Sequence, residues 1–161
     1  RVRESNRLDV VGFRGPFTCL NSARASIGFG ALGAAERCIE VALDYTESRH
    51  QFGVPLASKQ LVQKSLSDCV IEYNTCLAGC LAAHADGPPN TTAISILKKN
   101  SVRKSLDIAR TTQDLLGGNG IVGSYDIIRH ATNLSVVNVY EGTESIHSMI
   151  IGRDITGHSA F

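Results

Sequence analysis

The stretch LNSARASIGFGALGAAERCIEVALDY, residues 20–45, decides the fold class. Its small and apolar residues recur at steps of three and four, at Leu20, Ala23, Ile27, Ala31, Ala34, Cys38, Val41 and Tyr45. That spacing places them on one face of an α-helix. The pattern therefore predicts a long amphipathic helix that ends near Arg49, before Gly53 and Pro55.

Further helices are expected downstream of this stretch. A second follows Pro55 and is stopped by the Gly-Pro-Pro run at 87–89, and a third runs from a cap at Asn90, Thr91 or Thr92 to Gly117. A shorter segment is expected around 124–131 and a last helix from about Thr143 to Ile155. Long helices with short links pack as antiparallel neighbours, so we expect an all-α, up-and-down four-helix-bundle-like domain. Residues 1–8 suggest a short strand or linker.

Composition fits one globular domain. The chain has 161 residues, of which 43% are hydrophobic. Its net charge of +1, with basic residues scattered along the sequence, argues against a nucleic-acid partner. No apolar run approaches the roughly 20 residues that a membrane span needs, so we expect a soluble chain. Five cysteines without paired spacing are expected to be reduced core residues: Cys19, Cys38, Cys69, Cys76 and Cys80.

Two motifs have both a functional and a plain structural interpretation. Residues 28–33, GFGALG, match the dinucleotide fingerprint G-x-G-x-x-G, but they lie inside a helical pattern instead of after a strand. Small residues on a helix more simply let a neighbouring helix approach closely. Two Glu-x-x-His pairs, Glu47 with His50 and Glu144 with His147, resemble half of a di-iron ligand set. Exposed pairs of this kind are common by chance, and we expect no metal site.

Three other segments are ambiguous when each is taken alone. The run from Arg49 to Pro55 can simply end a helix, and the glycines 117–120 can be an ordinary turn or a place where a cofactor lies against backbone amides. Glu141 precedes Gly142 and the helix cap Thr143, where an acid is stabilised by the helix dipole. A base is usefully placed on such a turn only if a substrate reaches it.

The order and distances of these segments carry more information than any one of them. Arg49-x-Gln51-Phe52-Gly53, Leu116-Gly117-Gly118-Asn119-Gly120 and Tyr140-Glu141-Gly142-Thr143 together resemble the C-terminal third of acyl-CoA dehydrogenases. The stretches 15–24 and 52–57 and the ending ITGHSAF, residues 155–161, are similar to glutaryl-CoA dehydrogenases. Asp114 supports the narrower likeness, because many relatives with medium-chain substrates have Gln there. The resemblance covers residues 8–161.

The resemblance implies a domain arrangement and a site. Residues 1–15 would be the end of a preceding β-domain and its linker, and residues 16–161 the helical domain; an N-terminal helical domain and a middle β-domain would complete the enzyme. Glu141 would be the catalytic base. FAD would be bound, partly across a subunit boundary, by Arg49, Phe52, Gln60, Asp114, Leu115, Leu116, Gly117, Gly118, Thr143 and Phe161. The acyl-CoA would contact Phe17, Thr18, Cys19, Leu20, Asn21, Ser22, Ala23, Arg24, Tyr140 and Gly142.

The implied chemistry is α,β-dehydrogenation of an acyl-CoA thioester. Glu141 would take the α-proton while the β-hydrogen leaves as hydride to the flavin, and in the glutaryl case loss of CO2 would give crotonyl-CoA. By resemblance the protein would be a homotetramer that passes electrons to an electron-transfer flavoprotein. It would work in the mitochondrial matrix of a eukaryote or the cytoplasm of a bacterium.

Alternatives stay open at this point. The substrate could be another short or branched acyl-CoA without decarboxylation, because the arginine expected to bind the distal carboxylate of glutarate lies outside this chain. From other classes of protein, the bundle could serve as a helical oligomerisation module or as a di-iron protein.

Overall fold

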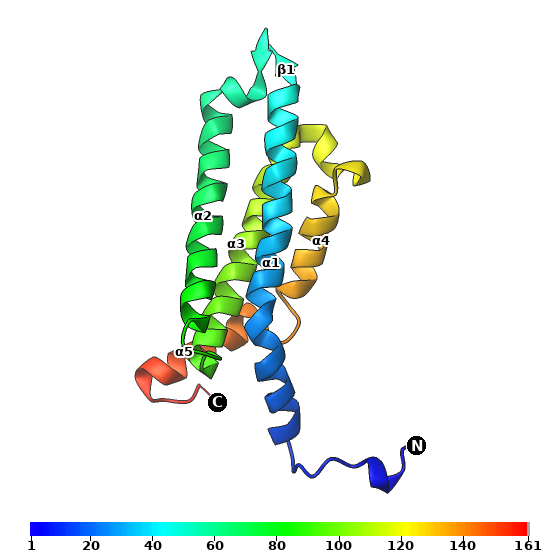
Figure 1. The fold of residues 1–161 in the computed structure, drawn as a ribbon, viewed down its shortest axis with the longest axis vertical. Coiled ribbons are helices and arrows are strands. Elements are labelled where there is room, and N and C mark those ends of the chain that lie inside the picture. The colour runs from blue at the N-terminus through cyan, green and yellow to red at the C-terminus, as the bar shows by residue number, and fades with distance from the viewer. Residues whose placement is uncertain (161) are drawn as a thin grey trace.

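The computed structural model describes residues 1–160, and all of its long elements are helices. In chain order the elements are η1 (Glu4–Asn6), α1 (Arg14–Ser48), β1 (His50–Gln51), β2 (Val54–Pro55), η2 (Leu56–Ser58), α2 (Gln60–His84), α3 (Thr91–Leu116), η3 (Gly117–Ile121), η4 (Gly123–Tyr125), α4 (Ile127–Val137) and α5 (Glu144–Thr156). Helices α1 to α4 alternate in direction and lie side by side along the long axis, with the β1–β2 hairpin at one end and α5 at the other (Figure 1). The predicted up-and-down bundle is confirmed.

Capping groups explain where the helices begin and end. The Asn90 side chain accepts a hydrogen bond of 2.8 Å from the Ala93 amide and caps α3, which selects one of the three residues that the sequence offered. Thr143 caps α5 as predicted, and Gly157, at φ 73°, ends that helix in the left-handed conformation.

The core forms around α1 and α3, which pack against each other at the centre of the bundle. Its largest cluster joins four helices through Ala31, Cys38, Val41, Ala42, Leu66, Val102, Leu106, Ala109, Leu116, Ile127, Ala131 and Leu134. Gly28 on α1 lies against α2 and α3: a Cβ there would stand 3.2 Å from Cys80 Sγ and 3.5 Å from Ser101 Oγ. Gly28 therefore serves close helix packing, whereas a Cβ on Gly30 or Gly33 would meet open space.

Several boundaries differ from the prediction. Residues 1–8 form no strand; they contain only η1. Helix α1 begins at Arg14, six positions before Leu20. The sequence did not reveal this start, because the residues of the first turns are largely exposed and leave no apolar stripe. Pro16 does not prevent it, because proline is tolerated in the first turn of a helix. The first helix of the bundle thus begins at Arg14, two residues before position 16.

Two other differences concern local structure. Arg49 to Pro55 end α1 as predicted, but the segment also folds into a hairpin in which Gln51 pairs with Val54, with Phe52 and Gly53 at its tip. The glycines at 117–120 form the short 3-10 helix η3. Four cysteines are buried, but Cys19 is exposed on the first turns of α1, so the expectation of five core cysteines was wrong for this one.

Candidate active site

The connection between α4 and α5 adopts an unusual backbone conformation. Glu141 has φ 52° and Gly142 has φ 102°, so two successive residues occupy the region that glycine tolerates and other residues rarely adopt. A Cβ on Gly142 would also lie 2.9 Å from Nε2 of His147. Residues 140–142 are called the base turn below. Its shape is a local strain that the surrounding structure must maintain.

Two buried cationic side chains hold the carbonyls of the base turn. Arg24 of α1, 6% exposed, donates from Nε to the Glu141 carbonyl at 2.6 Å. Lys98 of α3, 1% exposed, donates from Nζ to the Gly142 carbonyl at 2.8 Å and lies 5.9 Å from the centre of the Tyr140 ring. Two central helices thus fix adjacent peptide groups of the turn.

The Glu141 carboxylate itself is less completely bonded. Its side chain is partly buried, and Oε2 is out of contact with solvent yet has no hydrogen-bond partner within residues 1–160. A buried, unpaired carboxylate oxygen is costly unless a ligand or another group uses it. The arrangement gives Glu141 the capacity to accept a proton from a molecule bound beside the turn.

His147 lies directly beneath the turn, on the first turn of α5. The side chain is fully buried, and neither ring nitrogen has a hydrogen-bond partner among the described residues. Burial, followed by the charges of Lys98 and Arg24, lowers the pKa of His147 from 6.5 to about 4, although the carbonyls of Glu141 and Gly142 oppose the shift. The imidazole is therefore neutral at pH 7, and the interpretation of this Glu-x-x-His pair as exposed was wrong for His147.

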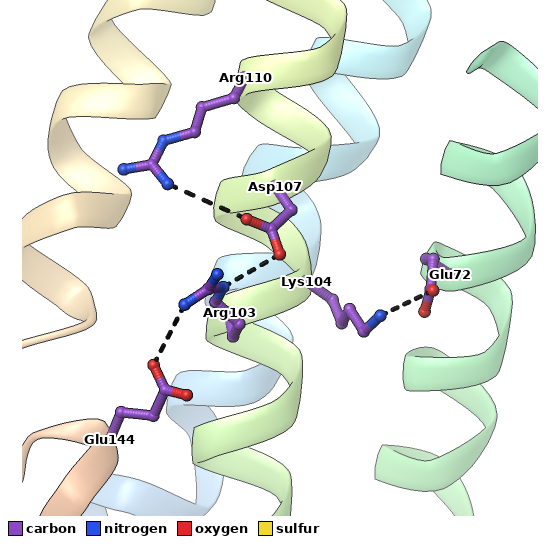
Figure 2. Close-up of polar contacts among 6 residues, drawn as sticks. All are labelled: Glu72, Arg103, Lys104, Asp107, Arg110 and Glu144. Atoms are coloured by element: carbon purple, nitrogen blue, oxygen red, sulfur yellow. Dashed lines mark hydrogen bonds and ion pairs between the residues drawn. The ribbon is translucent and has the colours of Figure 1, made fainter.

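A chain of ion pairs fixes the start of α5 against α3. Arg103 of α3 contacts Asp107 at 3.0 Å and Glu144, the first residue of α5, at 3.5 Å (Figure 2). Farther along, Lys104 contacts Glu72 of α2 at 2.7 Å. These side chains are half exposed, so each pair contributes at most about 1 kcal/mol. Of these pairs, Arg103–Glu144 links α3 to the first residue of α5, and Lys104–Glu72 links α3 to α2.

The other end of the bundle carries a groove of about 350 Å³ where α1 ends, between the hairpin and the end of α3. It is lined by Tyr45, Arg49, Gln51, Leu56, Asp114, Leu115, Leu116, Gly117, Gly118 and Asn119. Arg49 is exposed and forms no ion pair within the described chain, and Gly117 is exposed with φ 56°. An unpaired guanidinium beside glycine backbone suits a phosphate-bearing ligand.

The predicted cofactor residues fall into two places. Arg49 and residues 114–118 line the groove, whereas Phe52, at the hairpin tip, and Gln60, the first residue of α2, are not among its lining residues. Leu116 also belongs to the hydrophobic core and is buried. Thr143 lies at the opposite end, beside the base turn. Phe161 lies outside the described residues.

The predicted substrate stretch forms the first turns of α1. Phe17 is 53% exposed, and the hydroxyls of Thr18 and Ser22 bond to carbonyls one turn earlier. Leu20 and Asn21 are half-buried, whereas Cys19 and Ala23 are exposed. Arg24 faces the base turn, so its guanidinium is already engaged by the Glu141 carbonyl. Tyr140 and Gly142 lie on the turn itself.

Sequence reasoning missed Lys98 and misjudged His147. Lys98 lies four residues after Ile94 and four before Val102, within the buried stripe of α3. A lysine inside an otherwise apolar helical stripe is the signal that could have found it, because buried lysines require a specific partner. For the metal hypothesis, no group of three or more His, Cys, Asp or Glu side chains within residues 1–160 is arranged so that it could hold a metal ion.

The fold and these two ends define an all-α bundle domain with a carboxylate turn at one end and a glycine-lined groove at the other. The sequence model described as "acyl-CoA dehydrogenase, C-terminal domain" matches residues 11–156. The chain therefore belongs to the acyl-CoA dehydrogenase family. No helix among the described residues is long and apolar enough to cross a membrane.

The chain is similar in sequence and structure to several known members of this family. A glutaryl-CoA dehydrogenase from Mycobacterium smegmatis is 44% identical with a TM-score of 0.88, covering 91% of this chain and 38% of its own. A structure of a glutaryl-CoA dehydrogenase from the same organism in complex with FADH2 is 40% identical, with a TM-score of 0.90 and coverage of 94% and 40%. The acryloyl-CoA reductase (NADH) of Anaerotignum propionicum is 30% identical over 96% of this chain and 41% of its own length. The chain thus spans about two fifths of these relatives.

Proposed function

We propose that the protein carrying this chain is an FAD-dependent acyl-CoA dehydrogenase of the glutaryl-CoA type, in which Glu141 removes the α-proton. The observation that carries the proposal is the Glu141 carboxylate, held on a strained turn with one oxygen buried and unpaired. A site that maintains such strain with two buried cations requires that carboxylate at a defined position.

The residues of the base turn divide the work of the proposed reaction. Glu141 takes the α-proton as the C–H bond breaks, and FAD, when bound, supplies the acceptor for the β-hydrogen and its electron pair. Arg24 and Lys98 keep the turn from relaxing while the carboxylate changes charge. Gly142 lets the turn lie against His147 and Arg24, because a Cβ there would stand 2.9 Å from His147 Nε2, and the substrate thioester would lie beside its backbone.

The residues that would hold FAD fit its pyrophosphate. Arg49 offers an exposed guanidinium that forms no ion pair with any described residue, and Gly117 and Gly118 expose backbone with nothing within 4 Å of a Cβ position. Phe52, Gln60 and residues 114–116 would line the same cofactor. Because the groove and the base turn are at opposite ends of the bundle, we propose that the groove serves the FAD of a neighbouring subunit in a homotetramer.

The glutaryl-CoA preference rests on identity, since the two glutaryl-CoA dehydrogenase structures are 40–44% identical to this chain and the reductase is 30% identical. The proposed reaction oxidises glutaryl-CoA to glutaconyl-CoA, which then loses CO2 and takes up a proton to give crotonyl-CoA. We further propose an N-terminal helical domain and a middle β-domain, with residues 1–15 ending the latter. An electron-transfer flavoprotein is the proposed acceptor, in a mitochondrial matrix or a bacterial cytoplasm.

The decisive experiment replaces Glu141 by Gln in the full-length protein. The amide keeps the size of the side chain but cannot accept the proton, so turnover of glutaryl-CoA with a dye acceptor should fall about 1,000-fold while the bound flavin absorbance persists. An active Glu141→Gln enzyme contradicts the assignment of the base. Release of CO2 and crotonyl-CoA by the parent supports the glutaryl type, whereas an α,β-unsaturated product from butyryl-CoA or isovaleryl-CoA alone supports a dehydrogenase without decarboxylation.

A further inference from the structure

Lys98 touches or faces every residue of the base turn. Its Nζ donates to the Gly142 carbonyl at 2.8 Å, lies 5.9 Å from the Tyr140 ring centre and interacts electrostatically with Glu141. Of the basic side chains of α3, it is the most deeply buried, with 1% exposure. The other side chain that holds the turn, Arg24, comes from α1 and contacts the preceding peptide.

No acidic side chain within residues 1–160 lies close enough to form an ion pair with Lys98. Its hydrogen bond goes to a backbone carbonyl, and the second cation, Arg24, lies nearby and repels it. A buried charge in these surroundings costs free energy that an apolar side chain of similar length would not. Lys98 is therefore poorly explained by fold stability alone.

The adjacent lysine shows what a purely structural role looks like. Lys99 donates from Nζ to Ser148 Oγ of α5 at 2.6 Å and makes no contact with the base turn. Arg103 reaches Glu144 in the same way. Helix α3 thus carries side chains that hold α5 and, one position away from Lys99, a side chain that holds the turn.

We propose that Lys98 is a positioning residue for Glu141: it fixes the left-handed base turn through the Gly142 carbonyl and places a positive charge beside the Glu141 carboxylate. This inference rests on the proposed function, since it assumes that Glu141 is the base. Lys98 itself touches neither substrate nor cofactor in this role.

The electrostatic surroundings agree with this role. Burial, followed by Arg24, lowers the pKa of Lys98 to about 8, while Glu141 and Glu144 oppose the shift. The groups that face it are Arg24 from α1, Glu141 from the turn, and His147 and Glu144 from α5. The ammonium of Lys98 therefore persists at pH 7.

The test compares Lys98→Met with Lys99→Met in the full-length flavin-loaded protein. Methionine keeps the length of the side chain and removes both charge and donor. With glutaryl-CoA, or whichever of glutaryl-, butyryl- and isovaleryl-CoA is oxidised, Lys98→Met should lower kcat at least 30-fold with KM within threefold. The acidic limb of its kcat profile should move to higher pH by at least 0.5, because the carboxylate loses a stabilising cation. Lys99→Met should keep kcat within twofold and leave the pH profile unchanged.

A readout independent of turnover is the crystal structure of Lys98→Met, in which the backbone at 141 and 142 should leave its positive φ values. If Lys98→Met fails to fold, Lys98→Gln, which retains an N–H donor without the charge, decides by kcat and the acidic limb alone. The inference is overturned if the Lys98 variant keeps kcat within twofold, if its acidic limb stays in place, if the turn is unchanged, or if Lys99→Met loses as much activity. An inactive Glu141→Gln with a fully active Lys98→Met refutes this inference alone, whereas an active Glu141→Gln refutes the proposed base.

Discussion

The base turn and the cofactor groove sit at opposite ends of the same bundle and are built in opposite ways. At the base turn, side chains from α1 and α3 reach adjacent carbonyls and are almost completely buried. At the groove, Arg49, Gly117 and Gly118 are exposed. The conformation of the base turn is therefore fixed by contacts within the chain, whereas the groove exposes groups that a ligand or another protein surface can contact.

The largest expected effect is on stability and turnover, when glycine is replaced by alanine at the base turn and, for comparison, at the groove. Gly142→Ala would force a side chain into a backbone at φ 102° and place its Cβ 2.9 Å from His147 Nε2 and 3.4 Å from Arg24 Nη2. Strain and overpacking together should cost about 3–4 kcal/mol and abolish turnover. Gly118→Ala, whose Cβ meets nothing within 4 Å, should fold normally and weaken only flavin retention. Thermal unfolding and flavin absorbance measure both, and equal destabilisation by the two variants would contradict the comparison.

A smaller effect concerns acid stability at the buried end. The folded-state pKa of His147 is about 4, below its ordinary 6.5, so the unfolded chain binds a proton that the folded chain refuses between these pH values. Stability should therefore fall as the pH drops from 6.5 to 4, by up to about 3 kcal/mol, and be unaffected by this group above pH 6.5. His147→Gln should flatten that decline in urea unfolding followed by circular dichroism. The exposed His50→Gln at the hairpin is the matched control and should retain the parent's acid dependence.

The smallest effect is a gain at the open end. Phe52 is 89% exposed at the hairpin tip with φ 56°, a conformation that costs a phenylalanine about 1–2 kcal/mol and that asparagine adopts readily. The substitution also removes the cation–π contact of Lys59 Nζ, 5.5 Å from the centre of the Phe52 ring, and that loss destabilises the chain by about 0.5 kcal/mol. Phe52→Asn should therefore stabilise the chain by about 0.5–1.5 kcal/mol and reduce flavin affinity. Gln51 has no positive φ, so the control Gln51→Asn should give no such gain in stability. If Phe52→Asn binds flavin normally, Phe52 does not belong to the cofactor site.

The sequence predicted the long helices well because their apolar residues repeat at helical spacing, and it offered Asn90 and Thr143 as caps because their side chains suit that position. It did not reveal the exposed start of α1, which buries almost nothing, or the hairpin at 50–55, whose residues also suit a helix end. The groove residues were named by family resemblance, and their roles stay predictions. The motif analysis passed over Lys98 and took His147 for an exposed residue, because the surroundings of both arise from the base turn folding back onto α3 across more than 40 positions of sequence.

Helix α1 makes the two ends depend on each other in angle as well as in distance. Roughly 36 Å of uninterrupted helix, at 1.5 Å per residue, separates Arg24 from the end of α1 at Ser48. Each residue inserted or deleted between them would rotate one end by about 100° against the other, so that Arg24 and the hairpin could not both keep their places. A change of length inside α1 should therefore disrupt one of the two ends, whereas a change of length in the connections outside α1 leaves the angle between them intact.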